Sequence, residues 1–153
     1  MRIRECGIAD CDSDEITECE LRIADCESDD ISGGPINAED MKKRTRAFAL
    51  TIIRLVQGLP RTTEADVIGR QLLRSATSVG ANYRASCRAR SQADFVAKMG
   101  IVEEEADESI YWMELLVDAG VVNSNAVAEI LDEANQITAI VVSSIRTARG
   151  GKR

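Results

Sequence analysis

The stretch LLRSATSVGANYRASCRARSQADF, residues 72–95, decides the fold because it predicts the end of one helix, a short turn and the start of the next. Apolar and small residues from Leu72 to Cys87 recur at the three- and four-residue spacing of a single helical face. Ser91 is followed three residues later by Asp94, which is the pattern of a helix N-cap. The stretch therefore predicts two consecutive helices joined by a tight connection.

The same signals on either side of this stretch predict three connections and four helices in all. The predicted helices run from Asn37 to Gly58, from Thr63 to Cys87, from Ser91 to Gly120, and from Asn123 or Ser124 to Gly150. The inner stripe predicted for the third helix is Phe95, Met99, Val102, Ala106, Ile110, Met113 and Val117. No segment alternates polar and apolar residues with period two, so no sheet is expected. Because the connections are short, we predict an all-α, antiparallel up-down-up-down four-helix bundle over residues 37–149.

Composition agrees with a single domain whose two ends differ in charge. The chain has 153 residues, of which 44% are hydrophobic and only 3% aromatic, so aliphatic packing between helices should supply the core. Residues 1–40 contain 3 Lys/Arg and 13 Asp/Glu, whereas residues 41–153 contain 16 and 13. No apolar run approaches the roughly 20 residues that span a bilayer, and we predict a soluble, cytoplasmic protein with no membrane partner.

The acidic start of the chain contains an internal repeat. The sequence IADCDSDEI (residues 8–16) returns as IADCESDDI (residues 23–31), and neither copy has enough apolar residues to form a core of its own. We predict a disordered, acidic, cysteine-containing extension over residues 1–36 and a flexible basic tail over residues 150–153. An alternative is that the repeat is translated upstream DNA and that the functional chain begins near Met41.

Neither a metal site nor a catalytic site is predicted. The cysteines at positions 6, 11, 19 and 26 form no Cys-x-x-Cys pair, and the chain contains no histidine. Cys87 continues an apolar stripe and has no histidine to activate it, so a structural thiol is favoured over a nucleophile. The run EEEADE (residues 103–108) lacks the histidines of a di-iron site. We therefore predict no cofactor and no enzymatic activity.

Two helix faces suggest self-association. On the third helix, apolar and acidic residues gather on a face that is predicted to point away from the core, and on the second helix arginines lie opposite the apolar stripe. Carboxylates of one subunit could then meet arginines of the next, the alternative being an ordinary charged surface. The predicted oligomer interface is Arg70, Arg74, Ile101, Glu105, Glu108, Trp112 and Leu115.

The predicted topology also gathers cations at one end of the bundle, where the first helix begins, the second meets the third and the fourth ends. Such a cluster attracts phosphates, so RNA or DNA binding is one interpretation and a solvated basic end is the other. The predicted nucleic-acid-binding residues are Lys42, Lys43, Arg44, Arg46, Arg84, Arg88, Arg90, Lys98, Arg146 and Arg149. The carboxylates predicted at the opposite end are Glu64, Asp66, Glu114, Asp118, Glu129, Asp132 and Glu133. The acidic residues 1–40 enter at the basic end and could compete there for phosphate.

The stretch from Gly58 to Gly120 resembles a known family of small bacterial four-helix bundles, the 23S rRNA intervening sequence proteins. The matching features are the Leu59-Pro60 turn, the QLLRSATSVGAN helix (residues 71–82), the helix start at residues 90–95, and the glutamate-rich helix that leads to WMELL (residues 112–116). The resemblance covers about residues 41–149, and the first forty residues depart from it.

The resemblance implies a homo-oligomer, typically a pentamer, with no established enzymatic activity. Related accessory proteins of diversity-generating retroelements form basic pentamers that bind a reverse transcriptase and nucleic acid. We therefore expect a non-enzymatic, self-associating bundle that contacts RNA, DNA or a nucleic-acid enzyme, such as a reverse transcriptase, through its basic end. The alternative is a protein-interaction scaffold with no nucleic-acid role.

Overall fold

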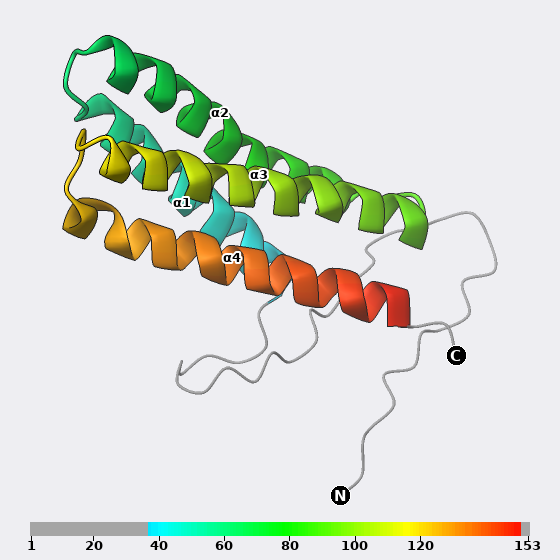
Figure 1. The fold of residues 1–153 in the computed structure, drawn as a ribbon. Coiled ribbons are helices and arrows are strands. Elements are labelled where there is room, and N and C mark those ends of the chain that lie inside the picture. The colour runs from blue at the N-terminus through cyan, green and yellow to red at the C-terminus, as the bar shows by residue number, and fades with distance from the viewer. Residues whose placement is uncertain (1–36, 151–153) are drawn as a thin grey trace, which may run out of the picture.

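Four long helices make up the part of the protein that the computed structural model describes, residues 37–150. The helices are α1 (Ala38–Gln57), α2 (Thr63–Ser86), α3 (Gln92–Asp118) and α4 (Ser124–Gly150). Consecutive helices run in opposite directions, as Figure 1 shows, and no strand occurs within these residues. The all-α, up-down-up-down bundle is therefore confirmed. The extension predicted over residues 1–36, and all but Gly150 of the predicted tail, lie outside the described residues.

Side-chain caps fix where three of the helices begin. Asn37 Oδ1 accepts a hydrogen bond from the Asp40 amide at 2.9 Å, and Ser91 Oγ accepts one from the Asp94 amide at 3.1 Å. Both caps are as predicted, whereas α2 is capped by Thr62 rather than by Thr63. A chain that began at Met41 would lack the Asn37 cap and the first turn of α1, although Met41 itself is fully buried.

The helices pack mainly against their neighbours in sequence. The contact between α2 and α3 is the most extensive and that between α1 and α4 the smallest. At the centre of the α2–α3 contact, Ser109 Oγ donates a hydrogen bond to Ser75 Oγ at 3.0 Å. Between α1 and α2 the approach is close, since a Cβ atom on Gly80 would lie 3.6 Å from the Thr45 carbonyl oxygen. These two contacts place Ser75 of α2 opposite Ser109 of α3 and Gly80 of α2 opposite Thr45 of α1.

The inner stripe of α3 differs from the prediction at two positions. Ser109 and Leu116 are buried, whereas Ile110 and Val117 are only half-buried. The apolar character of the isoleucine and valine favoured them in the sequence, but the helix turns the neighbouring positions toward the core. Ser109 is tolerated there because its hydroxyl is hydrogen-bonded to Ser75. The α3 core is therefore less apolar than its sequence pattern indicates.

An ion pair joins α1 to α4 where their packing is thinnest. Arg44 Nε donates to Glu133 Oε1 at 2.6 Å and Arg44 Nη2 donates to Glu133 Oε2 at 2.8 Å. The same Nη2 also donates to Gln136 Oε1. The two ionic side chains are 22% and 32% exposed, and the hydrogen bond to Glu133 raises the pKa of Arg44 above its ordinary value. This two-pronged geometry makes the pair a structural link between the first and last helices.

Loss of the Arg44–Glu133 pair should destabilise the bundle. We expect Arg44→Met to lower the free energy of unfolding by about 1–2 kcal/mol, because a hydrogen-bonded, half-buried charge loses its partner. Urea unfolding at a fixed protein concentration measures this change for Arg44→Met, for Glu133→Gln and for the double variant.

The double-mutant cycle should give a coupling energy of about 1 kcal/mol. Lys43→Met is the matched control, since Lys43 is an exposed neighbour on the same helix, and it should change stability by no more than about 0.5 kcal/mol. A coupling energy near zero would show that the pair does not hold α1 to α4.

Candidate interaction surfaces

The residues predicted as an oligomer interface form one set from α2 and α3, in which Arg74 of α2 lies near Glu105 of α3, while Arg70 lines a groove beside the α1–α2 turn. We call this the α2–α3 surface; its members are Arg70, Arg74, Ile101, Glu105, Glu108, Trp112 and Leu115. Ile101 is 42% exposed, while the other four α3 residues are half-buried. The prediction that the α3 face points away from the core is therefore wrong. Trp112 and Leu115 pack against the edge of the core, and the face adjoins α2.

Trp112 has contacts within its own chain that sequence reasoning did not foresee. Its Nε1–H donates to Glu108 Oε1 at 2.9 Å, and its ring lies edge-on to that of Tyr111, with centroids 4.9 Å apart. Tyr111 is 53% exposed and was missed as a candidate. Its position next to the only tryptophan was the signal that could have found it. Together with Ile101, it is the most exposed large apolar residue on α3.

The carboxylate of Glu105 lies in a partly buried and negatively charged environment. Burial is the main cause that raises its pKa above the ordinary value, and the neighbouring Glu108 adds to the shift. Arg74, from α2, opposes the shift. Arg74 is thus close enough to favour the charged form of Glu105 within one chain, whereas the sequence suggested that such arginines could meet carboxylates of a neighbouring subunit. Arg70 is likewise paired with its own helix, through Asp66 at 2.5 Å.

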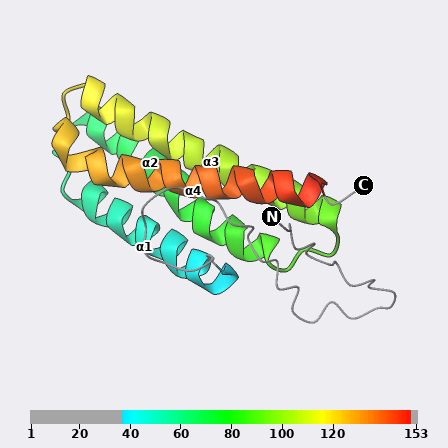
Figure 2. The same cartoon turned by 90° about the horizontal axis from the view of Figure 1, so that it is seen from below.

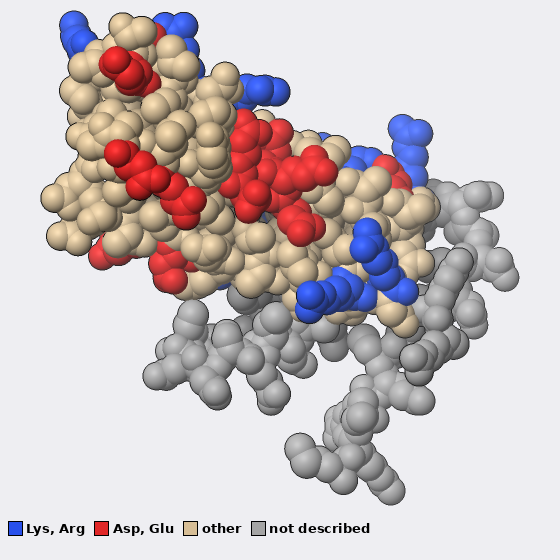
Figure 3. Space-filling model, in the orientation of Figure 1, with Lys and Arg blue, Asp and Glu red and all other residues tan. Residues whose placement is uncertain are grey.

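Carboxylates also dominate the molecular surface beside these residues. Figure 3 shows a group of acidic side chains in the middle of the molecule, over α3, and separate basic groups toward the ends. The middle of α3 carries the run of Glu103, Glu104, Glu105, Asp107 and Glu108. A negatively charged molecule would be repelled from this part of the bundle.

The ten cations predicted to bind nucleic acid fall into two classes. Three of them are half-buried and form ion pairs: Lys42 with Glu39 at 3.2 Å, Arg44 with Glu133, and Lys98 with Asp94. The other seven are exposed and form no ion pair within residues 37–150. We call these seven the basic end: Lys43, Arg46, Arg84, Arg88, Arg90, Arg146 and Arg149.

The fold brings two parts of the basic end together directly. Gln92, at the start of α3, donates a side-chain hydrogen bond to the Ala148 carbonyl oxygen near the end of α4. The α2–α3 turn and the last turns of α4 therefore lie side by side, as both Figure 1 and Figure 2 show. In both views α1 begins short of that end, so its cations lie further along the bundle.

The predicted separation of charge along the bundle is therefore incomplete. Glu133 was assigned to the opposite, acidic end, yet it pairs with Arg44 near the start of α1. The N-terminus of α3, which could attract an anion, already holds its own carboxylate. Asp94 accepts hydrogen bonds from the Arg90 amide at 3.0 Å and from Lys98. A phosphate at this end would thus be met by arginine side chains rather than by a free helix terminus.

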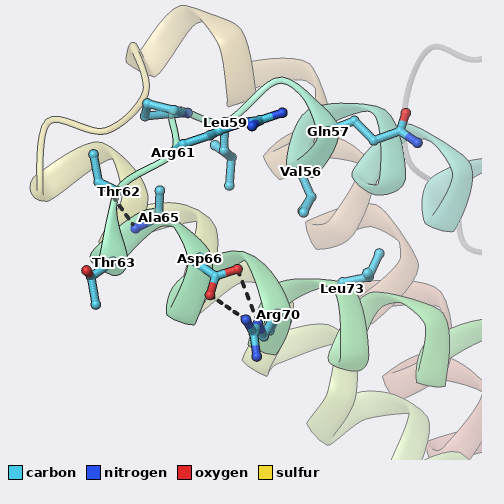
Figure 4. A pocket seen from close by; sticks show the side chains of 11 residues that line it. Val56, Gln57, Leu59, Arg61, Thr62, Thr63, Ala65, Asp66, Arg70 and Leu73 are labelled. Atoms are coloured by element: carbon cyan, nitrogen blue, oxygen red, sulfur yellow. Dashed lines mark hydrogen bonds and ion pairs between the residues drawn. The ribbon is translucent and has the colours of Figure 1, made fainter.

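A groove of ≈ 500 Å³ lies beside the α1–α2 turn, at the end opposite the α2–α3 turn. Figure 4 shows Val56 of α1 and Leu59 of the α1–α2 turn on one side and Ala65 and Leu73 of α2 on the other, with the Asp66–Arg70 pair at its rim. Sequence reasoning did not find this groove, because its lining comes from two helices and the turn between them. It contains no group of side chains suited to catalysis.

Cys87 follows the last turn of α2 and is half-buried. It neighbours Tyr83, whose pKa is raised chiefly because burial disfavours the phenolate and secondly because Cys87 is close by. Within residues 37–150 no three His, Cys, Asp or Glu side chains are grouped so that they could hold a metal ion. The same part of the chain contains no helix with the apolar length needed to cross a membrane.

The raised pKa of Glu105 predicts a pH-dependent gain in stability on its neutralisation. The folded protein binds the proton of Glu105 more tightly than the unfolded chain does. The stability that protonated Glu105 contributes to the wild type is therefore lost as the pH rises from the ordinary glutamate pKa of 4.5 through the folded-state pKa. We expect Glu105→Gln to raise the Tm at pH 7 by about 1–2 °C, and the gain should vanish below about pH 4.

Thermal unfolding followed by circular dichroism checks this expectation. Glu114→Gln is the matched control, since Glu114 is an exposed carboxylate on the same helix, and it should show no such dependence. A lower Tm for Glu105→Gln at pH 7 would mean that its charge stabilises the fold.

Comparison with known proteins agrees with this architecture. A family model described as 23S rRNA-intervening sequence protein matches residues 38–143, a range that starts at the first residue of α1 and ends within α4. No curated protein matches the chain.

A solved structure is also similar. It is the 1.70 Å crystal structure of a protein of unknown function from the S23 ribosomal protein family of Bacteroides thetaiotaomicron VPI-5482, with 33% sequence identity and a TM-score of 0.67. The likeness covers 71% of this chain and 97% of that one. Because the family model spans well over half of the residues and the solved relative has the same fold, the chain belongs to the 23S rRNA-intervening sequence protein family.

Proposed function

We propose that the protein is a non-enzymatic, self-associating bundle that contacts RNA or DNA, or a nucleic-acid enzyme, in the cytoplasm through its basic end. The observation that carries this proposal is the exposure of all seven cations of the basic end, without an ion pair among the described residues. Exposed arginines bind phosphate oxygens in a sequence-independent manner, and the release of counterions drives such binding.

The arrangement of these cations supports contact with an extended polyanion. They come from three separate parts of the chain, and the hydrogen bond from Gln92 to Ala148 holds two of these parts together. A phosphate backbone could therefore touch the α2–α3 turn and the end of α4 at once. The basic end carries no aromatic side chain on which a base could stack, so the contact would depend on charge rather than on base sequence.

Self-association through the α2–α3 surface would strengthen this contact. Ile101 and Tyr111 leave apolar area open beside the half-buried Trp112 and Leu115, and such area favours a protein partner. A contact that joins different surfaces of two copies closes into a ring when its rotation allows. A ring, of five copies if the chain follows the expectation from its family, would place several basic ends next to one another and multiply their field.

A protein-interaction scaffold without a nucleic-acid role is the second candidate function. It is favoured by the groove beside the α1–α2 turn and by the exposed Leu50 and Val67, at 45% and 54% exposure. These features lie on α1 and α2, away from the α3 carboxylates. Salt dependence separates the two functions, because an apolar contact with a protein does not weaken as phosphate binding does.

Removal of arginines from the basic end should weaken RNA binding. We expect the quadruple variant Arg84→Gln, Arg88→Gln, Arg146→Gln and Arg149→Gln to lose at least about tenfold in affinity for a single-stranded RNA at about 50 mM salt. Each lost phosphate contact should lower the slope of log Kd against log salt by about 0.7. Fluorescence anisotropy of a labelled oligonucleotide measures both quantities.

Arg54→Gln with Arg61→Gln provides a control at the other end of the bundle, where both arginines are exposed. An Arg146→Gln and Arg149→Gln double variant matches this control in charge. If the two doubles bind RNA equally well, or if the wild type shows no salt-dependent binding, the basic end is not the contact site.

Charges introduced at Ile101, on the α2–α3 surface, and at Tyr111, beside it, should dissociate the oligomer. Ile101→Glu and Tyr111→Glu are better suited than a change at Trp112, because their side chains are exposed and their replacement should leave the bundle folded. Sedimentation equilibrium should give a monomer for each variant and an assembly for the wild type. Leu50→Glu, an equally exposed apolar residue on α1, should remain assembled. An unchanged mass for both α3 variants would contradict this interface.

A further inference from the structure

We propose that the acidic segment of residues 1–36 docks on the basic end of its own bundle and competes there with phosphate. This inference rests on the proposed function for its biological consequence, but the docking itself does not require nucleic acid. The segment is the one part of the sequence that the proposed function leaves without a role, and its charge is opposite to that of the basic end.

Charge is the first argument for this pairing. Residues 1–36 contain 3 Lys/Arg and 11 Asp/Glu, a net charge of −8. The carboxylates are concentrated in the two repeats, residues 8–16 and 23–31, each of which has four carboxylates and no cation. Such a run presents closely spaced anionic groups along a backbone, as a single-stranded nucleic acid does with its phosphates.

The charge pattern of the bundle directs where the segment can dock. The carboxylates over α3 repel it, as the acidic group in Figure 3 indicates. At the basic end, seven exposed cations have no partner within residues 37–150. A carboxylate forms the same two-pronged hydrogen bonds with a guanidinium as a phosphate does, so the five arginines of the α2–α3 turn and the α4 end suit both ligands.

The attachment point is the second argument, because it sets the reach of the segment. The segment joins the bundle at Asn37, the cap of α1. Ile31, at the end of the second repeat, lies six positions before Asn37, a span of up to about 20 Å. Ile16, at the end of the first repeat, lies 21 positions before it, a span of up to about 70 Å. The longest helices, at 27 residues, measure only about 40 Å.

The first repeat can therefore reach every cation of the basic end, whereas the last residue of the second repeat reaches only cations within about 20 Å of Asn37. Because the contact is made within one molecule, it benefits from an effective concentration that reaches the millimolar range for short tethers. Weak individual ion pairs are then enough to occupy the site until a longer polyanion displaces them. As a consequence, a ligand with few phosphates does not displace the segment, whereas a long nucleic acid, with many phosphates, does.

The experiment uses the full chain and compares two charge-matched variants. In the repeat variant, the second copy is neutralised by Asp25→Asn, Glu27→Gln, Asp29→Asn and Asp30→Asn. In the control variant, four exposed carboxylates of the bundle are neutralised by Glu64→Gln, Glu114→Gln, Asp118→Asn and Glu129→Gln. Both changes remove four negative charges, so a general effect of net charge would act equally on both. A third variant neutralises both repeats.

Two measurements are made on each protein. The first compares backbone amide chemical shifts by NMR without nucleic acid, at about 50 mM and at about 200 mM salt. The second is the affinity for a labelled oligouridylate of about 20 nucleotides, measured by anisotropy. We expect the repeat variants to shift the amides of residues 84–92 and 142–150 at low salt. We also expect about tenfold tighter RNA binding when both repeats are neutralised.

The outcomes distinguish this inference from the proposed function. Amides of the basic end that are identical in the wild type and the repeat variants would overturn the docking, whatever the RNA result. Shifted amides with no RNA binding by any version would support the docking and overturn the proposed RNA contact. Shifted amides with equal RNA affinity in all versions would overturn the competition. A gain in affinity shared by the control variant would assign the effect to net charge and not to docking.

Discussion

The packing of α2 against α3 is the constraint on which the rest of the structure depends. The two helices share the most extensive contact of the bundle, and the buried Ser75–Ser109 hydrogen bond fixes their register. This hairpin supplies the centre of the core through Leu72, Val79, Val102 and Met113. It also places the cations of the α2–α3 turn at one end of the bundle and the α3 face from Ile101 to Leu115 beside α2. The α3 face and the three arginines of the α2–α3 turn therefore follow from one helix pair, while α1 and α4 supply the other four cations of the basic end.

Burial separates the charges that hold the fold from those that remain open to a partner. Arg44 is half-buried, makes two hydrogen bonds to Glu133 and links the first helix to the last. A surface ion pair contributes only about 0–1 kcal/mol, so the exposed cations of the basic end give up little stability by having no partner. Their contact with a polyanion is consequently compatible with a fold that owes its stability to aliphatic packing.

The sequence was sufficient to predict what depends on local chemistry and periodicity. The four helices, the Asn37 and Ser91 caps and the buried positions of α2 follow from spacing and from side chains that act within one turn of themselves. The stripe of α3 was displaced at Ile110 and Val117, because hydrophobicity alone cannot foresee that Ser109 finds a hydroxyl partner on another helix. Two features depend on tertiary packing. One is the start of α1, which lies short of the bundle end formed by the α2–α3 turn, and the other is the Arg44–Glu133 pair, whose residues are 89 positions apart in the sequence. The same holds for the half-buried state of Trp112 against the edge of the core, whereas its hydrogen bond to Glu108 is a local contact four residues away on the same helix.

Hydrogen exchange of the full chain, with and without a long single-stranded RNA, tests the central claim most directly. The claim is that an antiparallel bundle gathers cations from distant stretches into one surface for a polyanion. The account predicts added protection of the amides in residues 84–92 and 142–150, which should disappear as the salt concentration rises. Protection centred on residues 103–112 of α3, or unchanged exchange at the basic end while RNA is bound, would contradict it.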